Sequence, residues 1–249
     1  MNKPLEQKIA LVTGASRGIG AAIAQRLAAD GAELVLHYGS GRTETDALAA
    51  SLRETGTKVH LLQADLASVD GGRELLERLS GLQLPRIDIL VNNAGVAPAA
   101  SLSETTSEDF EKIVNVNMRS LFFVTQGVAP LMPAGSRIVN ISSGITRSAL
   151  PGAVVYAASK GFVEVLTLHL AAELGPKGIT VNAVAPGVID TRMNPWIHGP
   201  GGKESLAQMQ ALAGIGQPTY VAGVVAFLVG PDGVWTTGQV VDASGGSKL

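Results

Sequence analysis

The stretch Thr13-Gly14-Ala15-Ser16-Arg17-Gly18-Ile19-Gly20 is the most informative part of this 249-residue chain. An apolar run, Ile9–Thr13, leads into it and a helical run, Ala21–Leu27, follows, which is the strand-to-helix context that a dinucleotide site requires. Glycines let the backbone approach a pyrophosphate, and the helix N-terminus favours its negative charge. The spacing is Gly-x-x-x-Gly-x-Gly, not the commoner Gly-x-Gly-x-x-Gly. A tight turn without a ligand is the alternative.

Short apolar runs alternate with longer helical patterns along the rest of the chain. The predicted strands are Ile9–Thr13, Glu33–His37, Lys58–Gln63, Ile87–Asn92, Ser136–Ile141, Thr180–Ala185 and Gln239–Asp242. The predicted helices are Gly20–Ala29, Thr43–Arg53, Gly71–Leu79, Glu108–Leu131 and Val154–Leu174. Such helices suit the crossovers of a parallel sheet. We therefore predict an α/β fold in which residues 1–249 form a single domain, a doubly wound Rossmann-type parallel seven-stranded sheet with helices on both faces.

The composition excludes several classes of protein. Charged residues make up 16% of the chain, the net charge is −2, and no basic run exceeds two residues, so we expect no nucleic-acid partner. The chain has no cysteine, which excludes disulfides and thiolate metal sites, and we expect no metal. Residues 1–8 are polar and no apolar run approaches the roughly 20 residues of a membrane helix. We expect a cytoplasmic protein without membrane contact.

The end of the second predicted strand bears on the choice of dinucleotide. An NAD-preferring site usually places an acid here, against the ribose 2′-hydroxyl. The run His37-Tyr38-Gly39-Ser40-Gly41-Arg42 holds no carboxylate. Arg42 and Arg17 can together meet a 2′-phosphate while Ser40 donates a hydrogen bond. We predict NADP(H) over NAD(H); the alternative is that both arginines are solvated surface residues.

Two more segments fit an extended dinucleotide. Asp65-Leu66, after the third strand, can contact an adenine. Asn92-Asn93-Ala94-Gly95, after the fourth, has small residues that let the backbone approach the cofactor. Ordinary turn chemistry would also account for either segment.

Taken in order, these residues resemble the short-chain dehydrogenase/reductase family over essentially the whole chain. The matching pieces are Thr13–Gly20, Asn92–Gly95, Asn117, Ser142-Ser143, Tyr156 with Lys160, and Pro186-Gly187 through Thr191. The resemblance implies an NADP-preferring enzyme of the 3-oxoacyl-reductase-like or carbonyl reductase branch, with Asn117, Ser143, Tyr156 and Lys160 as its catalytic residues. The cofactor positions are Gly14, Ser16, Arg17, Gly18, Ile19, Gly20, Tyr38, Ser40, Arg42, Asp65, Leu66, Asn93, Ala94, Gly95, Tyr156, Lys160, Pro186, Gly187, Ile189 and Thr191.

The chemistry of the catalytic set can be argued beside the resemblance. Tyr156 and Lys160 lie four positions apart on a predicted helix and therefore share one face. A neighbouring ammonium and an oxidised nicotinamide would lower the pKa of the phenol from about 10 toward working pH. Tyr156 would then act as acid in reduction and base in oxidation. Ser143 can donate to the substrate carbonyl, whereas Ser142 points to the other face of its strand.

The family pattern implies further roles. Lys160 would hold the nicotinamide ribose hydroxyls, and Asn117 would hold a water that extends a proton relay; we choose Asn117 over Asn115 because its neighbourhood matches the family. The loop that follows the sixth strand would meet the carboxamide through the backbone of Ile189 and through Thr191.

The substrate is the least determined feature. A substrate loop is expected at about residues 191–215. Its apolar residues, with those near the catalytic pair, suggest a ketone or secondary alcohol; the candidates are Ile145, Leu150, Val155, Met193, Trp196, Ile197 and Met209. Members of the family that reduce acyl carrier protein thioesters commonly show basic residues just before the fifth strand. Residues 132–135 lack them, so the resemblance favours a ketone and keeps a 3-oxoacyl thioester as an alternative. Sugar or polyol oxidation and a non-catalytic NADP(H) sensor remain alternatives. The resemblance implies a homotetramer paired through residues 108–132 and 154–174.

Overall fold

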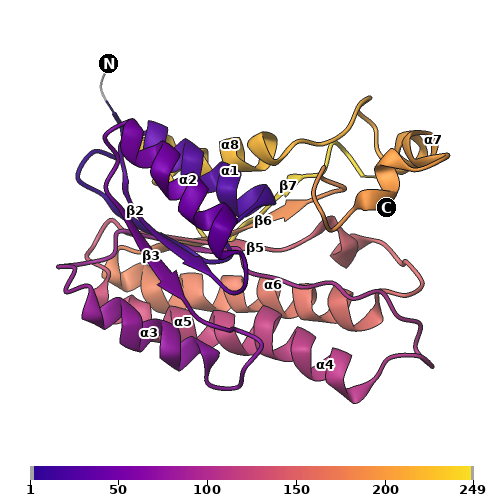
Figure 1. The fold of residues 1–249 in the computed structure, drawn as a ribbon, viewed down its shortest axis with the longest axis horizontal. Helices are drawn as coiled ribbons and strands as arrows, with labels where there is room; N and C mark the ends of the chain where they lie inside the picture. The colour runs from indigo at the N-terminus through magenta and orange to yellow at the C-terminus, as the bar shows by residue number, and fades with distance from the viewer. Residues whose placement is uncertain (1–2, 248–249) are drawn as a thin grey trace.

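The computed structural model describes residues 3–247, which contain one parallel sheet of seven strands in the order β3-β2-β1-β4-β5-β6-β7 (Figure 1). The strands are β1 Ile9–Val12, β2 Glu33–Tyr38, β3 Val59–Gln63, β4 Ile89–Asn92, β5 Arg137–Ile141, β6 Thr180–Pro186 and β7 Val240–Ala243. The strand order reverses between β1 and β4, which pair in parallel from Ala10–Ile89 to Val12–Val91. The carboxyl ends of these two strands therefore border the crevice where doubly wound sheets bind ligands.

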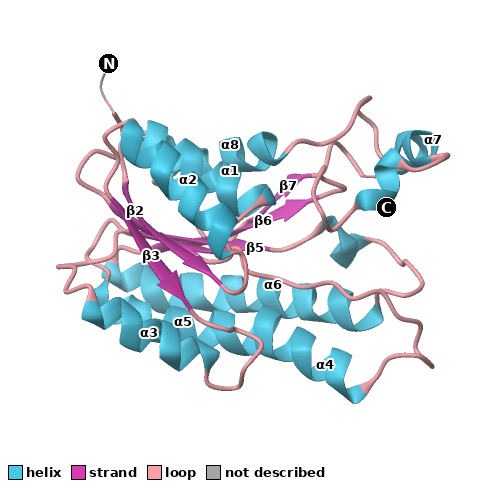
Figure 2. Ribbon diagram, viewed as in Figure 1, coloured by secondary structure: helices cyan, strands magenta, loops and turns pink. Residues whose placement is uncertain are grey.

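Helices cover both faces of the sheet, with α1, α2 and α8 on one side and α3, α5 and α6 on the other (Figures 1 and 2). The helices are α1 Gly18–Ala29, α2 Arg42–Glu54, α3 Gly71–Gly81, α4 Ser107–Ile113, α5 Ser120–Val128, α6 Val154–Leu174, α7 Gly202–Met209 and α8 Pro218–Val229. Successive strand residues serve opposite cores: Leu34 and Leu36 pack with α1 and α8, whereas Val35 packs with α3 and α5. The predicted doubly wound fold is confirmed.

Two predicted segments differ from the structure. The single helix expected over Glu108–Leu131 is interrupted by a π-helical turn, Val114–Arg119, and ends in a 3-10 turn, Ala129–Leu131. The substrate loop expected at about residues 191–215 contains a 3-10 turn, Pro195–His198, and helix α7. The expectation of a loop there did not anticipate these short helices.

Helix α6 also corrects an expectation about apolar length. Together with the 3-10 turn that follows it, residues Val154–Lys177 are long and apolar enough to cross a bilayer by length and composition, with a mean hydropathy of 1.3 over an 18-residue window. A single helix of this kind is weak evidence for a membrane span, because core helices pass the same test. In this structure α6 lies against the sheet and carries the buried side chains of Lys160, Val163 and Thr167.

Candidate active site

The glycine turn after β1 leaves the start of α1 open for an anion. Gly14 and Gly18 adopt positive φ angles of 65° and 55°, which favour glycine. Within the described residues, no side chain caps α1, and no acid lies in its first turn. The first backbone N–H groups of a helix lack intrahelical partners and attract negative charge. A Cβ at Gly18 would lie 3.2 Å from Cγ2 of Thr191, so the loop after β6 faces this turn.

His37 supports the turn, and sequence reasoning missed this role. The N–H of Gly14 donates to Nδ1 of His37 at 3.2 Å, and Nε2 of His37 lies 3.1 Å from the carbonyl of Ala64. Both bonds form at once in the neutral tautomer that carries its proton on Nε2. Burial lowers the pKa of His37 to about 4, although the Ala64 carbonyl acts to raise it. The only sequence signal was a polar residue in an otherwise apolar strand.

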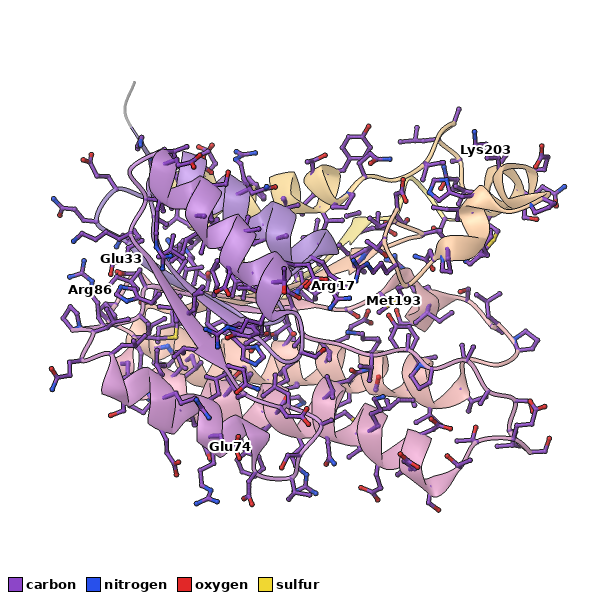
Figure 3. All side chains as sticks on the ribbon, viewed as in Figure 1. Arg17, Glu33, Glu74, Arg86, Met193 and Lys203 are labelled. Carbon is purple, nitrogen blue, oxygen red and sulfur yellow. The ribbon has the colours of Figure 1, made fainter. Side chains whose placement is uncertain are left out.

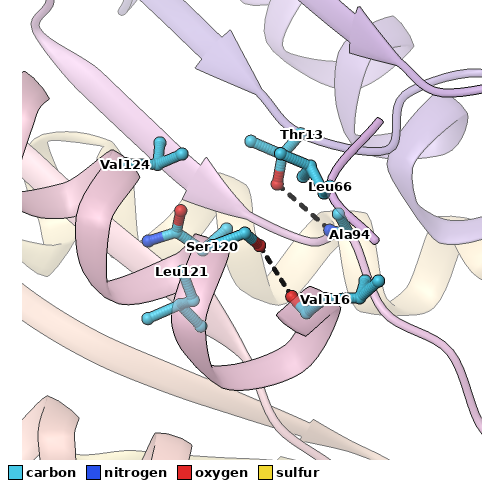
Figure 4. A pocket seen from close by; sticks show the side chains of 8 residues that line it. Thr13, Leu66, Ala94, Val116, Ser120, Leu121 and Val124 are labelled. Carbon is cyan, nitrogen blue, oxygen red and sulfur yellow. Dashed lines mark hydrogen bonds between the residues drawn. The ribbon is translucent and has the colours of Figure 1, made fainter. Parts of the chain in front are cut away.

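The segment after β4 is tied to the same turn. Oγ1 of Thr13 accepts from the N–H groups of Asn93 and Ala94 at 3.0 and 3.1 Å. Nδ2 of Asn93 donates to the carbonyls of Thr13 and Gly14 at 2.9 and 3.0 Å. Figure 4 shows the small pocket beside these contacts, lined by Leu66, Val116 and Ser120 among others. Hydrogen bonds thus join the segment after β1 to the segment after β4, at the place where the strand order reverses.

Three predicted cofactor contacts, Tyr38, Asp65 and Leu66, have little free surface or are already engaged. Tyr38 and Leu66 are 4% and 5% exposed, so a ligand can reach little of either side chain. Tyr38 lies on the same strand face as Leu34 and Leu36, and every residue of β2 after Glu33 is buried. Asp65 remains exposed, but its Oδ1 already accepts the N–H of Ala67 at 3.0 Å.

The residues predicted for a 2′-phosphate lie around Gly41. A Cβ at Gly41 would lie 2.7 Å from Cβ of Ser16 and 3.1 Å from Nη2 of Arg17, which brings the glycine turn against the end of β2. Ser40 and Arg42 flank Gly41 and are exposed, although Nε of Arg42 bonds Asp46 at 3.3 Å.

A carboxylate that sequence reasoning did not consider also lies in this corner. Oε1 of Glu44 lies 3.2 Å from Nη1 of Arg192. The pKa of Glu44 is lowered, chiefly by its own backbone N–H and further by Arg17 and Arg192. The carboxylate of Glu44 therefore competes with a cofactor phosphate for Arg17.

Tyr156 and Lys160 lie together on α6, but their electrostatics differ from the expectation. Nζ of Lys160 lies 5.8 Å from the centroid of the Tyr156 ring and donates to the carbonyl of Ile141 at 2.8 Å. Burial raises the pKa of the Tyr156 phenol, while a hydrogen bond with Ser143 acts to lower it. Burial also lowers the pKa of Lys160 to about 8. Burial is the largest cause for both groups, and at Tyr156 it outweighs the hydrogen bond with Ser143, so the phenol is not made more acidic here.

The two serines after β5 point to different partners. Ser143 is extended, caps the 3-10 turn Gly144–Arg147, and its Oγ accepts from the N–H of Ile145 at 3.3 Å. Ser142 is 2% exposed and donates to Oε1 of Glu164 at 2.8 Å. The structure therefore places Ser143, and not Ser142, beside Tyr156.

The structure also separates Asn117 from Asn115. Asn117, in the π-helical turn, donates from Nδ2 to the carbonyl of Val96 and accepts the N–H of Val96 at Oδ1, both at 2.9 Å. A Cβ at Gly95 would lie 3.6 Å from Oδ1 of Asn117 and 3.5 Å from Nζ of Lys160, so these three residues adjoin. Asn115 instead donates to the carbonyl of Ala67.

The loop after β6 is closely packed. A Cβ at Gly187 would lie 2.8 Å from Ser244, and Ile189 is 3% exposed. The carbonyl of Ile189 accepts from Oγ1 of Thr191 and from Nδ2 of Asn194, at 3.3 and 3.0 Å.

The substrate candidates fall into two groups. Leu150, Met193 and Trp196 are 46%, 49% and 40% exposed, so ligands can reach them. Figure 3 shows Met193 and Arg17 on the side away from Glu33, which begins β2. Ile197 is fully buried, so its inclusion as a substrate contact was wrong: it anchors the loop in the core. A pocket beside Tyr156 is lined by residues including Pro98, Asp109, Gly152 and Val155. Ile145 is half-buried.

The comparisons with known proteins cover almost the whole chain. Residues 14–248 match the family model described as enoyl-(acyl carrier protein) reductase. A 3-oxoacyl-[acyl-carrier-protein] reductase of Synechocystis is 38% identical over 98% of this chain and 98% of that protein. A short-chain dehydrogenase of Burkholderia cenocepacia, solved with NADP, is 40% identical, with a TM-score of 0.92 over 98% of each chain. The angucycline C-6 ketoreductase LanV with bound NADP is 41% identical, with a TM-score of 0.92 over 98% of this chain and 96% of that one.

Proposed function

We propose a function that follows from the family, since this chain belongs to the short-chain dehydrogenase/reductase family. It is an NADP(H)-dependent oxidoreductase that interconverts a ketone and a secondary alcohol. The observation that carries the proposal is the convergence of Ser143, Tyr156 and Lys160 at the carboxyl ends of the strands, next to Asn117 and Gly95. A serine and a tyrosine hydroxyl side by side suit a carbonyl oxygen that gains negative charge.

The protein's own residues fit NADP(H). The uncapped start of α1 would hold the pyrophosphate, and Arg17, Ser40 and Arg42 around Gly41 would hold the 2′-phosphate. The side chain of Thr191 faces the glycine turn at Gly18, and the loop of residues 186–191 would hold the carboxamide end, beside Lys160. When bound, NADPH supplies the hydride that reduces a carbonyl carbon. NADP is also the cofactor bound to LanV and to the Burkholderia cenocepacia enzyme.

The side chains supply the proton and stabilise the charge. Because burial raises the pKa of Tyr156, the phenol keeps its proton at neutral pH and holds it ready for the carbonyl oxygen. Ser143 donates a second hydrogen bond to the same oxygen. Lys160, with a pKa of about 8, is still largely protonated at pH 7 and stabilises the phenolate that remains. In the oxidation direction the phenolate takes the proton back.

A ketone is the substrate class that the loop favours. The exposed side chains of Leu150, Met193 and Trp196 offer apolar surface. LanV is a ketoreductase, which supports the same class. The similarity to the Synechocystis 3-oxoacyl-[acyl-carrier-protein] reductase makes a 3-oxoacyl thioester the second candidate.

The test is consumption of NADPH and NADH with a panel of ketones, ketoesters and an acyl thioester. Tyr156→Phe should abolish turnover and leave NADPH binding intact, because it removes only the phenolic hydroxyl. Tyr220→Phe makes the same change at an exposed residue of α8 and should behave as wild type. An active Tyr156→Phe enzyme would refute the assigned role.

The homotetramer expected from the sequence belongs to the same proposal. It is supported by the outward face of α6, where Val165 and Leu168 are 60% and 59% exposed, and by Phe122 and Phe123 on α5 at 38% and 44%. Apolar side chains gathered in this way are typical of subunit contacts. Val165→Glu should yield a smaller particle in light scattering, and a wild-type monomer would overturn the expectation.

The cytoplasmic location likewise stays a proposal. It is supported by the cofactor, because cells keep NADPH inside. Cell fractionation with an antibody to the protein is the test, and recovery in a membrane or secreted fraction would contradict it.

A further inference from the structure

We propose that Glu164 is a positioning residue for the catalytic serine: it holds the turn that carries Ser143 against α6 through the hydroxyls of Ser142 and Thr146. The inference rests on the proposed function, because it takes Ser143 and Tyr156 as the pair that contacts the substrate oxygen. Glu164 itself need not touch substrate or cofactor.

The contacts of Glu164 lie on both sides of Ser143 in the chain. Its Oε1 accepts from Oγ of Ser142 at 2.8 Å and from Oγ1 of Thr146 at 2.9 Å. Ser142 directly precedes Ser143, and Thr146 belongs to the 3-10 turn that Ser143 caps. An ionised carboxylate only accepts hydrogen bonds, so both hydroxyls must donate to it. One oxygen atom therefore fixes the orientation of two side chains that flank the serine.

Helix α6 carries both Glu164 and Tyr156. Glu164 lies four residues after Lys160 and eight after Tyr156 on α6, which places all three on one helix face. Ser142 also lies within 3.5 Å of the Lys160 carbonyl. Because a helix is rigid over two turns, holding Ser142 and Thr146 to Glu164 fixes the position of Ser143 relative to Tyr156.

The hydrogen bonds that Glu164 accepts leave the hydroxyl hydrogen of Ser143 free for the substrate. Oγ of Ser143 accepts from the N–H of Ile145 at 3.3 Å, so its own hydroxyl hydrogen remains available to the tyrosine or to a substrate oxygen. Oγ1 of Thr146 also lies 3.1 Å from the carbonyl of Ser143. With Glu164 removed, Thr146 would turn its hydrogen to that carbonyl, and Ser142 would lose its charged acceptor. The turn would then hold Ser143 less firmly.

The experiment compares Glu164→Ala with Glu164→Gln. Misplacing a catalytic group costs up to about 100-fold in rate, so Glu164→Ala should lower kcat about 10- to 100-fold while KM and NADPH affinity stay near wild type. Glu164→Gln keeps a carbonyl oxygen that accepts both hydroxyls and should restore most of kcat. Glu173→Ala removes an exposed carboxylate from the same helix and should leave kcat unchanged.

A second measurement does not depend on turnover. Hydrogen exchange of residues 142–148, followed by mass spectrometry without added cofactor, should be faster in Glu164→Ala and unchanged in Glu164→Gln. If the wild type turned over no substrate, the proposed function would fail. This measurement would still decide whether Glu164 holds the turn through Ser142 and Thr146.

Three results would overturn the inference. Wild-type kcat in Glu164→Ala would remove the role altogether. Equal losses of kcat in Glu164→Gln and Glu164→Ala would show that the charge matters and not the acceptor. If Glu164→Ala did not fold, the double variant Ser142→Ala, Thr146→Val would take its place, because it removes the donors and keeps Glu164; full kcat in that variant would contradict the proposal.

Discussion

His37 should make stability fall as the pH drops from 6.5 to 4, and should weaken cofactor binding by the folded protein only near pH 4. Its side chain is 2% exposed and accepts the N–H of Gly14, and burial lowers its pKa from 6.5 to about 4. The unfolded chain takes up a proton near pH 6.5, whereas the folded protein resists it until about pH 4. Protonation therefore favours the unfolded state inside this window, and the stability present above pH 6.5 is progressively lost.

The size of the effect follows from the two pKa values. A difference of one pKa unit corresponds to about 1.4 kcal/mol, so the full loss of free energy of unfolding is about 3 kcal/mol by pH 4. By the same linkage relation, about 1.4 kcal/mol is lost by pH 5.5 and about 2.5 kcal/mol by pH 4.5. These losses are a large share of the 5–15 kcal/mol that is typical of folded domains.

Urea unfolding monitored by circular dichroism at several pH values between 7.5 and 4.5 measures this loss. His37→Asn should be about 1 kcal/mol less stable than wild type at pH 7.5, because one hydrogen bond is missing, but should lose less stability toward pH 4.5. His169→Asn, at an exposed residue of α6, controls for histidine substitution itself. Parallel curves for wild type and His37→Asn over this range would refute the reasoning. NADPH affinity of the folded protein should weaken only as the pH falls through about 4, because His37 becomes protonated there and no longer accepts the Gly14 N–H.

The remaining predictions concern cofactor choice, the asparagine pair and the loop anchor. Arg17→Ala and Arg42→Ala should each weaken NADPH binding about tenfold in a fluorescence titration, since each removes a charged hydrogen bond to phosphate, and should leave NADH binding unchanged; equal effects on both cofactors would contradict the 2′-phosphate assignment. Asn117→Ala should lower kcat strongly in the ketone assay, whereas Asn115→Ala should retain it, and the reverse result would reassign the role. Ile197→Ala should lower the free energy of unfolding by about 2–5 kcal/mol in urea titrations, because the side chain is fully buried; a smaller loss would indicate that the loop does not depend on this anchor.

The parts of the fold that local pattern controls were predictable from the sequence. The bounds expected for α6, Val154–Leu174, are those of the structure, and β2 extends only one residue beyond its expected end. Apolar runs bounded by glycine turns signal such elements directly. Helix α8 was not predicted, because its sequence is apolar on every side and shows no polar face.

Some features of the site were predictable from local sequence patterns, and others were not. The spacing of Tyr156 and Lys160 and the glycine turn are local patterns, so the sequence placed them correctly on a helix and at a strand end. The role of His37 depends on contacts with Gly14 and Ala64, which are 23 and 27 residues away in the chain. The contacts of Glu164 with Ser142 and Thr146 span 22 and 18 residues. Local spacing carries no information about such pairs.

The π-helical turn at residues 114–119 amounts to one extra residue inside an otherwise α-helical segment. Each residue of an α-helix advances by about 100°. A relative that lacked one residue here would keep the helix but turn Asn117 about a quarter-circle away from Val96. Single-residue gaps should therefore be rare at this place among functional relatives, even though the surrounding helix would accommodate them without strain. The number of residues in this segment should therefore be as strictly constrained as the identity of a catalytic side chain.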